Sequence, residues 1–486
     1  MRSRSIGSGF PLMLLVAAAL WLGTTPFTVA HSTTFTTICT LASSTCGGGS
    51  GGGFYPEGGL VADGSGNLYG TTSNGGTHGA GTIFELTPNG ATYAYTVLHN
   101  FCPGTTCCPS MTDDSCQDGQ TPLGNLIMDV YGNLYGTTAQ GGPNTGPDSS
   151  RAGIVFKLQH PASGTNWTIH RLHNFCSAVT SGVCSDGEFP MSGLSYKPTS
   201  SSPYYNGTDP LYGTTYVGGQ YTPGNYGGGA LFKLTPGSTW TETVVHSFGD
   251  PSVGNGTFVD GFFPVAGVTL DSSGNIFGTT SGGGLNNAYG GVIFKIDTSN
   301  NYGLLYEFCE TTPPNSSLCT DGRYPNANLT LDSNGNIFGT TLAGSTDPNQ
   351  GSQGVGLVFK LPSGSSNVTV LYSFCAGLST CTDGNQPAPG SGLILSSTGD
   401  IYGTTKYGGN GVGSVGGEVY KLHPSGGSYT MSWSHGFCQT QGCNNSPSDG
   451  DQPVTGLTQD AAGNMYGTTY YGGTSNGGTI YKVAEP

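Results

Sequence analysis

One short phrase recurs seven times along this chain and constrains the fold more than any other feature. Its copies read LYGTT, IFGTT, IYGTT or MYGTT, and their glycines are spaced 61 to 77 residues apart. The repeats are centred on Gly70, Gly136, Gly213, Gly278, Gly339, Gly403 and Gly467. A supersecondary unit repeated at a nearly constant period indicates a repeat architecture.

Each copy lies within a unit that reads as four β-strands. A segment such as 124–129 precedes the phrase, a GTIFEL-type run follows a glycine-rich loop, and a YTVLHNF-type run such as 95–101 ends the unit. Short β-branched and aromatic runs between Gly, Pro, Asn and Asp are strand signals, and no segment of the mature chain has helical period and length. Four antiparallel strands per repeat are typical of a β-propeller blade, so we expect an all-β fold.

The two ends of the chain complement one another. The last unit stops after its third strand, at 483–486, whereas 33–41 (TTFTTICTL) resembles a fourth strand without the other three. Pairing of the two would complete the seventh blade and remove an open sheet edge. We therefore predict one seven-bladed β-propeller over 31–486, with 31–59 as closing strand and lead-in loop. The alternative, an open solenoid, would require polar capping repeats.

Residues 1–30 have the features of a signal peptide. Arg2 and Arg4 precede an apolar run over 10–22, and small residues favour cleavage near Ala30. No later segment approaches the roughly 20 apolar residues of a membrane span. The sequence predicts an exported protein, located outside the cell or in the periplasm, with no membrane span.

Fourteen cysteines fit an oxidising compartment. Six pairs follow the fourth strands and are expected to form local disulfides: Cys39 with Cys46, Cys102 with Cys116, Cys176 with Cys184, Cys309 with Cys319, Cys375 with Cys381, and Cys438 with Cys443. Pairing of Cys107 and Cys108 stays open. The spacing does not match a zinc site, and we expect neither a metal nor a cofactor.

Two aspartate phrases recur as well. D-x-x-G-N, as in 271–275, suits a tight hairpin, although calcium ligation is the alternative. D-G-x-x-P, as in 186–190, reads as a scaffold turn that leads into the first strand. Six lysines share one repeat position, and we expect their stems to pack and their ammonium groups to pair with carboxylates. Four histidines share another position with Tyr306 and Tyr372, which also indicates a scaffold role.

These phrases resemble the Gloeo/Verruco (GloVer) type of secreted bacterial tandem repeats, of the form D-x-x-G-N-L-Y-G-T-T, then G-G, then G-T-I-F-K-L. The resemblance covers essentially the whole mature chain. More distantly, the G-N-[LI]-[YW] strand is similar to that of NHL and streptogramin-lyase propellers. The resemblance implies a propeller but no particular activity.

Function is expected where the repeats differ. By analogy with known propellers, the fourth-to-first and second-to-third connections share one face, and most length variation falls there, which is typical of a binding surface. The connections on the opposite face are mostly short and constant, except for an insertion at 196–210 in the third unit. Aromatic rings on the variable face suit apolar sugar faces or a protein partner. The predicted ligand-binding residues are Tyr216, Tyr221, Tyr226, Tyr289, Tyr407, Tyr470 and Tyr471.

Charge narrows the choice of partner. Without Arg2 and Arg4, the mature chain has 11 basic and 28 acidic residues, a net charge of −17. Nucleic acid and anionic polysaccharide are therefore disfavoured. We expect a secreted binding module for neutral carbohydrate or protein.

Two alternatives remain open. A propeller lyase or hydrolase would place singular residues over the central channel, and candidates outside the repeat consensus include Arg151, Glu188, Arg323, Lys406 and Glu418. Glu188 and Arg323 are the first choices for a catalytic role, because both follow D-G in their loops. The other alternative is a self-associating component of an extracellular matrix or filament, which low charge and disulfides would favour.

Overall fold

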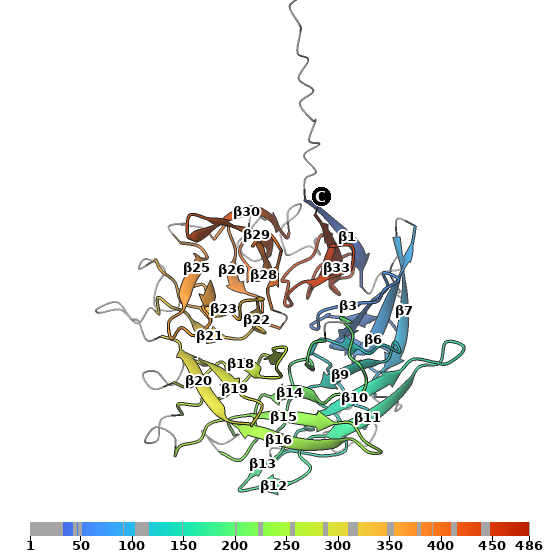
Figure 1. The fold of residues 1–486 in the computed structure, drawn as a ribbon. Coiled ribbons are helices and arrows are strands. Elements are labelled where there is room, and N and C mark those ends of the chain that lie inside the picture. Colours follow the sequence, from blue (N-terminus) through green and yellow to red (C-terminus); the bar gives the residue numbers. More distant parts are fainter. Residues whose placement is uncertain are drawn as a thin grey trace, which may run out of the picture.

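The fold is a ring of seven antiparallel sheets (Figure 1). The computed structural model describes residues 33–41, 46, 51–90, 92–102, 116–147, 149–199, 202–221, 227–252, 258–284, 290–309, 319–347, 354–376, 381–390, 392–409, 416–438 and 448–485. Within these ranges there is no α-helix, and hence none long and apolar enough to cross a membrane. The predicted all-β, seven-bladed propeller is confirmed.

The blades follow one another in chain order. Blade 1 contains β3 (Val61–Ala62), β4 (Leu68–Thr72), β6 (Thr82–Asn89) and β7 (Thr92–Asn100). Blade 2 contains β8 (Ile127–Met128), β9 (Leu134–Thr138), β10 (Ile154–Gln159) and β11 (Thr168–Asn174). Blade 3 contains β14 (Leu211–Thr215), β15 (Ala230–Thr235) and β16 (Thr241–Ser247). Blade 4 contains β17 (Thr269–Leu270), β18 (Ile276–Thr280), β19 (Val292–Ile296) and β20 (Tyr302–Glu307).

Blades 5 and 6 have five strands each because an additional short strand pairs at their inner edge. Blade 5 contains β21 (Arg323–Pro325), β22 (Thr330–Leu331), β23 (Ile337–Ala343), β24 (Leu357–Leu361) and β25 (Thr369–Ser373). Blade 6 contains β26 (Asn385–Pro387), β27 (Ile394–Leu395), β28 (Ile401–Tyr407), β29 (Glu418–Ser425) and β30 (Ser428–Gly436). Small ribbons β2 (Gly53–Phe54) with β5 (Asn74–Gly75), and β12 (Val179–Thr180) with β13 (Val183–Cys184), lie outside the blades.

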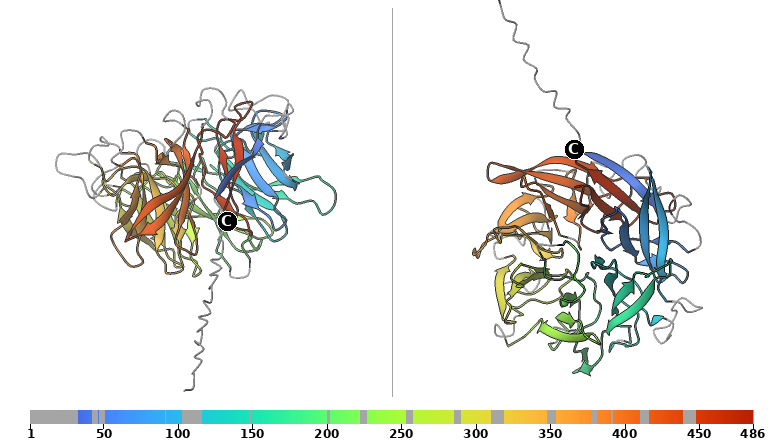
Figure 2. Two further views of the ribbon diagram at one scale, coloured as in Figure 1. Left: turned by 90° about the horizontal axis from the view of Figure 1, so that it is seen from above. Right: turned by 45° about the vertical axis from the view of Figure 1, so that its right-hand side comes forward.

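The N-terminal strand closes the ring. Blade 7 contains β31 (Thr458–Gln459), β32 (Met465–Thr469), β33 (Thr479–Ala484) and, as its outermost strand, β1 (Thr34–Thr40), which runs antiparallel to β33 (Figure 2). The ring of Phe35 also stacks on His435 of blade 6, with centroids 3.6 Å apart. The predicted closure is therefore confirmed.

The glycine of each repeated phrase makes room for an aromatic ring on the next strand. In blade 4, Gly278 of β18 faces Phe294 of β19, whose side chain is fully buried. A Cβ at Gly278 would lie only 2.5 Å from Phe294 Cζ. The same contact recurs at Gly70, Gly136, Gly213, Gly339, Gly403 and Gly467. A side chain at this position would push the ring out of the core.

The aspartate phrases form the predicted scaffold turns. In the D-x-x-G-N hairpin, Asp271 Oδ1 accepts from the backbone N–H of Asn275 at 2.9 Å, and Oδ2 accepts from its side-chain amide at 2.7 Å. In D-G-x-x-P, Asp186 Oδ2 lies 3.1 Å from His173 Nε2. Burial raises the pKa of Asp186, but hydrogen bonds from His173 and Ser177 outweigh it and lower the pKa.

The repeated aspartate and its partner join the fourth strand of one unit to the next unit. Equivalent contacts are His99 with Asp118, His246 with Asp260, Tyr306 with Asp321, Tyr372 with Asp383, and His435 with Asp449. The scaffold role expected for these histidines and tyrosines is therefore confirmed.

The repeated lysines pack across the second strand. Lys157 Nζ lies 5.5 Å from the ring centroid of Tyr135, and Lys295, Lys360, Lys421 and Lys482 sit over the equivalent rings. Of the lysines with described contacts, Lys421 also forms ion pairs with Asp400 and Glu485. The regular partner of the ammonium group is thus an aromatic ring rather than the expected carboxylate.

Five of the predicted disulfides are present: Cys39–Cys46, Cys102–Cys116, Cys176–Cys184, Cys309–Cys319 and Cys375–Cys381. Each closes a local loop after the fourth strand. Cys107, Cys108 and Cys443 lie outside the described residues, as do the signal peptide and its cleavage site.

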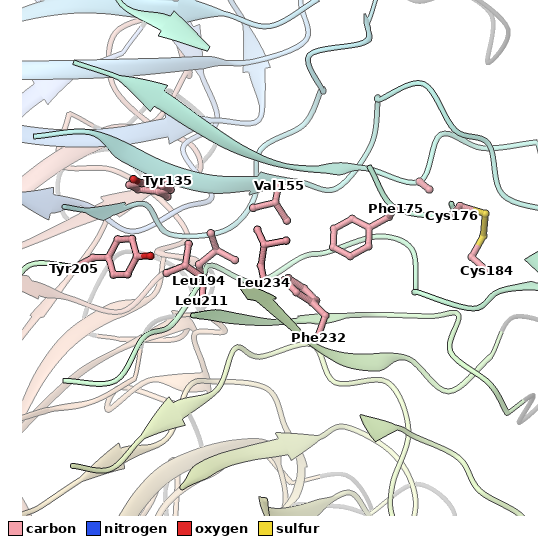
Figure 3. Packing of buried hydrophobic residues seen from close by; sticks show 11 residues of the cluster. Tyr135, Val155, Phe175, Cys176, Cys184, Leu194, Tyr205, Leu211, Phe232 and Leu234 are labelled. Carbon is pink, nitrogen blue, oxygen red and sulfur yellow. A yellow bond between two sulfur atoms is a disulfide. The ribbon is translucent and has the colours of Figure 1, made fainter. Parts of the chain in front are cut away.

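The insertion in the third unit folds back over blade 2. The backbone N–H of Tyr205 donates to Met128 at 2.9 Å, and that of Val130 donates to Tyr205. Tyr205 is fully buried and meets Tyr135 edge to face, with centroids 5.3 Å apart (Figure 3). Figure 3 shows both rings at one end of a core cluster that continues through Val155 and Leu234. The described residues of the insertion, 196–199 and 202–210, thus pack as part of the propeller.

We predict that Gly278→Ala destabilises the protein by roughly 1–3 kcal/mol, because the new methyl group overlaps the Phe294 ring. Gly303→Ala is the matched control in the same blade: its Cβ would meet only the Lys295 carbonyl, at 3.8 Å. Urea denaturation of the two variants measures the difference. Equal stability of the variants would contradict this explanation of the repeated glycine.

Candidate functional site

A cavity of about 180 Å³ lies on the axis of the ring, because all seven blades contribute to its lining. Its walls include the residue that follows the proline of the D-G-x-x-P phrase or of its equivalent in the first unit. These residues are Glu57, Leu123, Met191, Val265 and Val454, and Asn328 and Pro389 complete the ring. A mostly apolar cavity with a few polar groups is the usual form of a small-ligand site.

The residues that directly precede the same prolines form what we call the rim. They are Tyr55, Thr121, Phe189, Phe263, Tyr324, Gln386 and Gln452, all with φ between 55° and 62°. Each donates its backbone N–H to the preceding blade, as from Phe263 to Gly228 at 2.7 Å. Non-glycine residues seldom adopt positive φ, so this backbone is held by the joints between blades.

The rim side chains are uncharged and half-buried. Four are aromatic and three carry a hydroxyl or amide. Two rings stack on predicted tyrosines: Tyr55 on Tyr470, with centroids 4.7 Å apart, and Phe263 on Tyr216, with centroids 4.9 Å apart. Tyr471 meets Tyr470 edge to face at 4.5 Å. Part of the predicted tyrosine set therefore gathers at the rim.

The other predicted tyrosines are spread more widely. Tyr407 lies beside Lys406, whose Nζ is 5.2 Å from the ring centroid. Tyr221 lines a separate cavity of about 600 Å³ on blade 3, together with His246 and Asp250. Tyr226 and Tyr289 lie outside the described residues. The structure therefore does not join all seven tyrosines into one described surface.

Two residues of opposite charge line the axial cavity. Burial raises the pKa of Glu57, while a hydrogen bond from Ser73 and the positive charge of Lys406 act in the opposite direction. Burial raises the pKa of the Tyr470 hydroxyl to about 12, and the negative charge of the nearby Glu57 carboxylate acts in the same direction. Lys406 is among the residues that the sequence singles out. Glu57 is not, because Gly52 replaces the aspartate of its D-G-x-x-P phrase.

Glu188 and Arg323 occupy the same repeat position in blades 3 and 5, with blade 4 between them. The backbone of Glu188 forms an isolated antiparallel β-bridge with Val217, and the backbone of Arg323 in β21 pairs with Ala343 in β23. Both side chains are buried, and the Arg323 guanidinium lies 4.3 Å from the Tyr324 ring centroid. Their catalytic role stays a prediction, and the structure does not bring the two together.

The two remaining sequence candidates are also buried. Arg151 donates to the Gly142 carbonyl at 2.7 Å. Burial raises the pKa of Glu418 to about 7, and the charge of Asp383 acts in the same direction. Neither lines the axial cavity.

Two further cavities lie beside the insertion. One, of about 630 Å³, lies between Tyr196, Pro203 and blade 4, and the other, of about 340 Å³, lies between the insertion and blades 1, 2 and 7. Asn328 lines both the first of these and the axial cavity.

Comparison with known proteins identifies the repeat but no activity. The family described as the Gloeobacter/Verrucomicrobia repeat matches residues 25–201 and 315–486. A search of curated proteins found no match. Among solved structures, one described as an oxidoreductase (glucose dehydrogenase) from Thermus thermophilus is similar at 14% identity and a TM-score of 0.41, over 75% of this chain and 96% of that one.

We predict that Glu57→Gln raises the free energy of unfolding near neutral pH. Burial makes the charged carboxylate unfavourable, so its folded pKa lies above the unfolded value of about 4.3. Any stability that such a group contributes is present below the unfolded pKa and is lost as the pH rises through the folded pKa. The advantage of the variant should therefore shrink as the pH falls toward about 4. Denaturation at several pH values measures it, and a variant less stable than the wild type at neutral pH would contradict the prediction.

Proposed function

We propose that this chain, which belongs to the Gloeobacter/Verrucomicrobia repeat family, is an extracellular binding module for neutral carbohydrate. The supporting observation is the uncharged rim, which combines four aromatic side chains with hydroxyl and amide groups and directly precedes the prolines that lead into the wall of the axial cavity. Aromatic rings pack against the apolar face of a sugar, while amides and hydroxyls hydrogen-bond to its hydroxyl groups.

The disulfides and the charge support the same proposal. Five local disulfides fit an exported protein, for which the leader at 1–30 is the expected signal. The net charge of −15 for the full chain disfavours acidic polysaccharides and nucleic acid. A rim held by backbone bonds between blades is also rigid, so little conformational entropy is lost on binding.

We predict that the purified mature protein is retained on neutral polysaccharides, and that salt changes this retention little, because no charges need to be screened. Tyr470→Ala and Tyr216→Ala should each weaken binding roughly tenfold through loss of one stacking partner. Tyr131→Ala is the control, because Tyr131 is 73% exposed in a hairpin turn away from the rim. Affinity electrophoresis gives the dissociation constants.

The alternative functions of the protein predict different outcomes of the same experiment. Retention on acidic polysaccharides alone, or no retention at all, would contradict carbohydrate binding and direct attention to a protein partner or to self-association. Release of reducing or unsaturated ends would show that the protein is an enzyme.

A further inference from the structure

Two side chains of opposite charge line the axial cavity without forming an ion pair. We propose that Glu57 and Lys406 form a binding site for a small zwitterion, namely a free α-amino acid with an apolar side chain. This inference goes beyond the carbohydrate function and does not depend on it.

Glu57 and Lys406 face one cavity without forming an ion pair. Both side chains line it, yet among the described residues no ion pair, which requires an N···O distance of at most 4.0 Å, joins them. Lys406 contacts the Tyr407 ring, and the Glu57 carboxyl is partly desolvated. Placing two charges in a confined cavity without direct pairing is costly unless a ligand or water lies between them.

The arrangement of the two charges matches a ligand with both charges close together. Lys406 directly follows the repeated phrase of blade 6, Glu57 comes from the first unit, and Val454 of blade 7 lines the wall between their blades. A ligand ammonium group would bind the Glu57 carboxylate, and a ligand carboxylate would bind Lys406. Each contact would be a charge-assisted hydrogen bond.

The remaining walls favour an apolar side chain on the ligand. Leu123, Met191 and Val265 come from blades 2 to 4 and line the opposite part of the cavity. A volume of about 180 Å³ is below the range of drug-sized sites and suits a molecule of amino-acid size. A simple amine or a simple carboxylate would leave one protein charge without a partner, so both should bind more weakly.

The test is calorimetric titration of the mature wild-type protein with L-leucine, 3-methylbutylamine and 4-methylpentanoate. We expect leucine to bind more than about tenfold tighter than either singly charged analogue, because only leucine satisfies both protein charges. No leucine binding, or equal binding of the three compounds, would overturn the proposal without involving any variant.

Variants then locate the site. Glu57→Gln and Lys406→Met should each reduce leucine affinity more than about tenfold. Lys197→Met is the control, because Lys197 is an exposed lysine in the insertion. Thermal melting confirms that each variant is folded. Unchanged leucine affinity in both site variants would place the binding elsewhere and overturn the assignment, whereas polysaccharide retention would be unaffected by that result.

Discussion

The pairing of β1 with β33 is the interaction on which the rest of the structure depends. Each of six blades is built from one continuous stretch of the chain, but blade 7 takes its outermost strand from the start of the described chain. This pairing covers the edge of β33 and places Phe35 on His435 of blade 6. It also fixes blade 7 between blades 6 and 1, so that Lys406, Tyr470 and Glu57 surround one part of the axial cavity. An open arrangement would separate the first and last units and would not form the cavity.

Within that ring, repeated and singular residues have different tasks. The repeated glycine, aspartate, histidine and lysine positions are used by the scaffold itself: the glycine admits a ring, the aspartates hold turns, and lysine lies over the second strand. The positions that vary between blades are those of the rim and of the cavity wall. Because every blade presents the same backbone there, the chain can change a single side chain, such as Glu57 where other units have Leu123 or Val265, without disturbing the fold.

Local, repeated signals made most of the fold predictable from the sequence. The blades, the hairpins and five disulfides follow from short patterns that recur in most or all units, and the closing strand follows from the incomplete units at the two ends of the repeat array. Three features were less accessible. The first strands are short, as in β8 with only Ile127 and Met128, because they converge near the axis and pair with a single neighbour. The positive φ of the rim residues could not be predicted from the sequence, because aromatic residues rarely adopt it. The proximity of Glu57 to Lys406 is set by closure of the ring, which no local pattern encodes.

Hydrogen exchange of the backbone amides in 34–40, followed by mass spectrometry of the mature protein, tests the closed ring most directly. If β1 is the outermost strand of blade 7, the amides in 34–40 that donate to β33 will be protected far longer than those of an unstructured peptide, because they are bonded within the sheet. Exchange of 34–40 as fast as in an unstructured peptide, while β32 and β33 remain protected, would show that the ring is open. The shared cavity between blades 6 and 1 would then lose its structural basis.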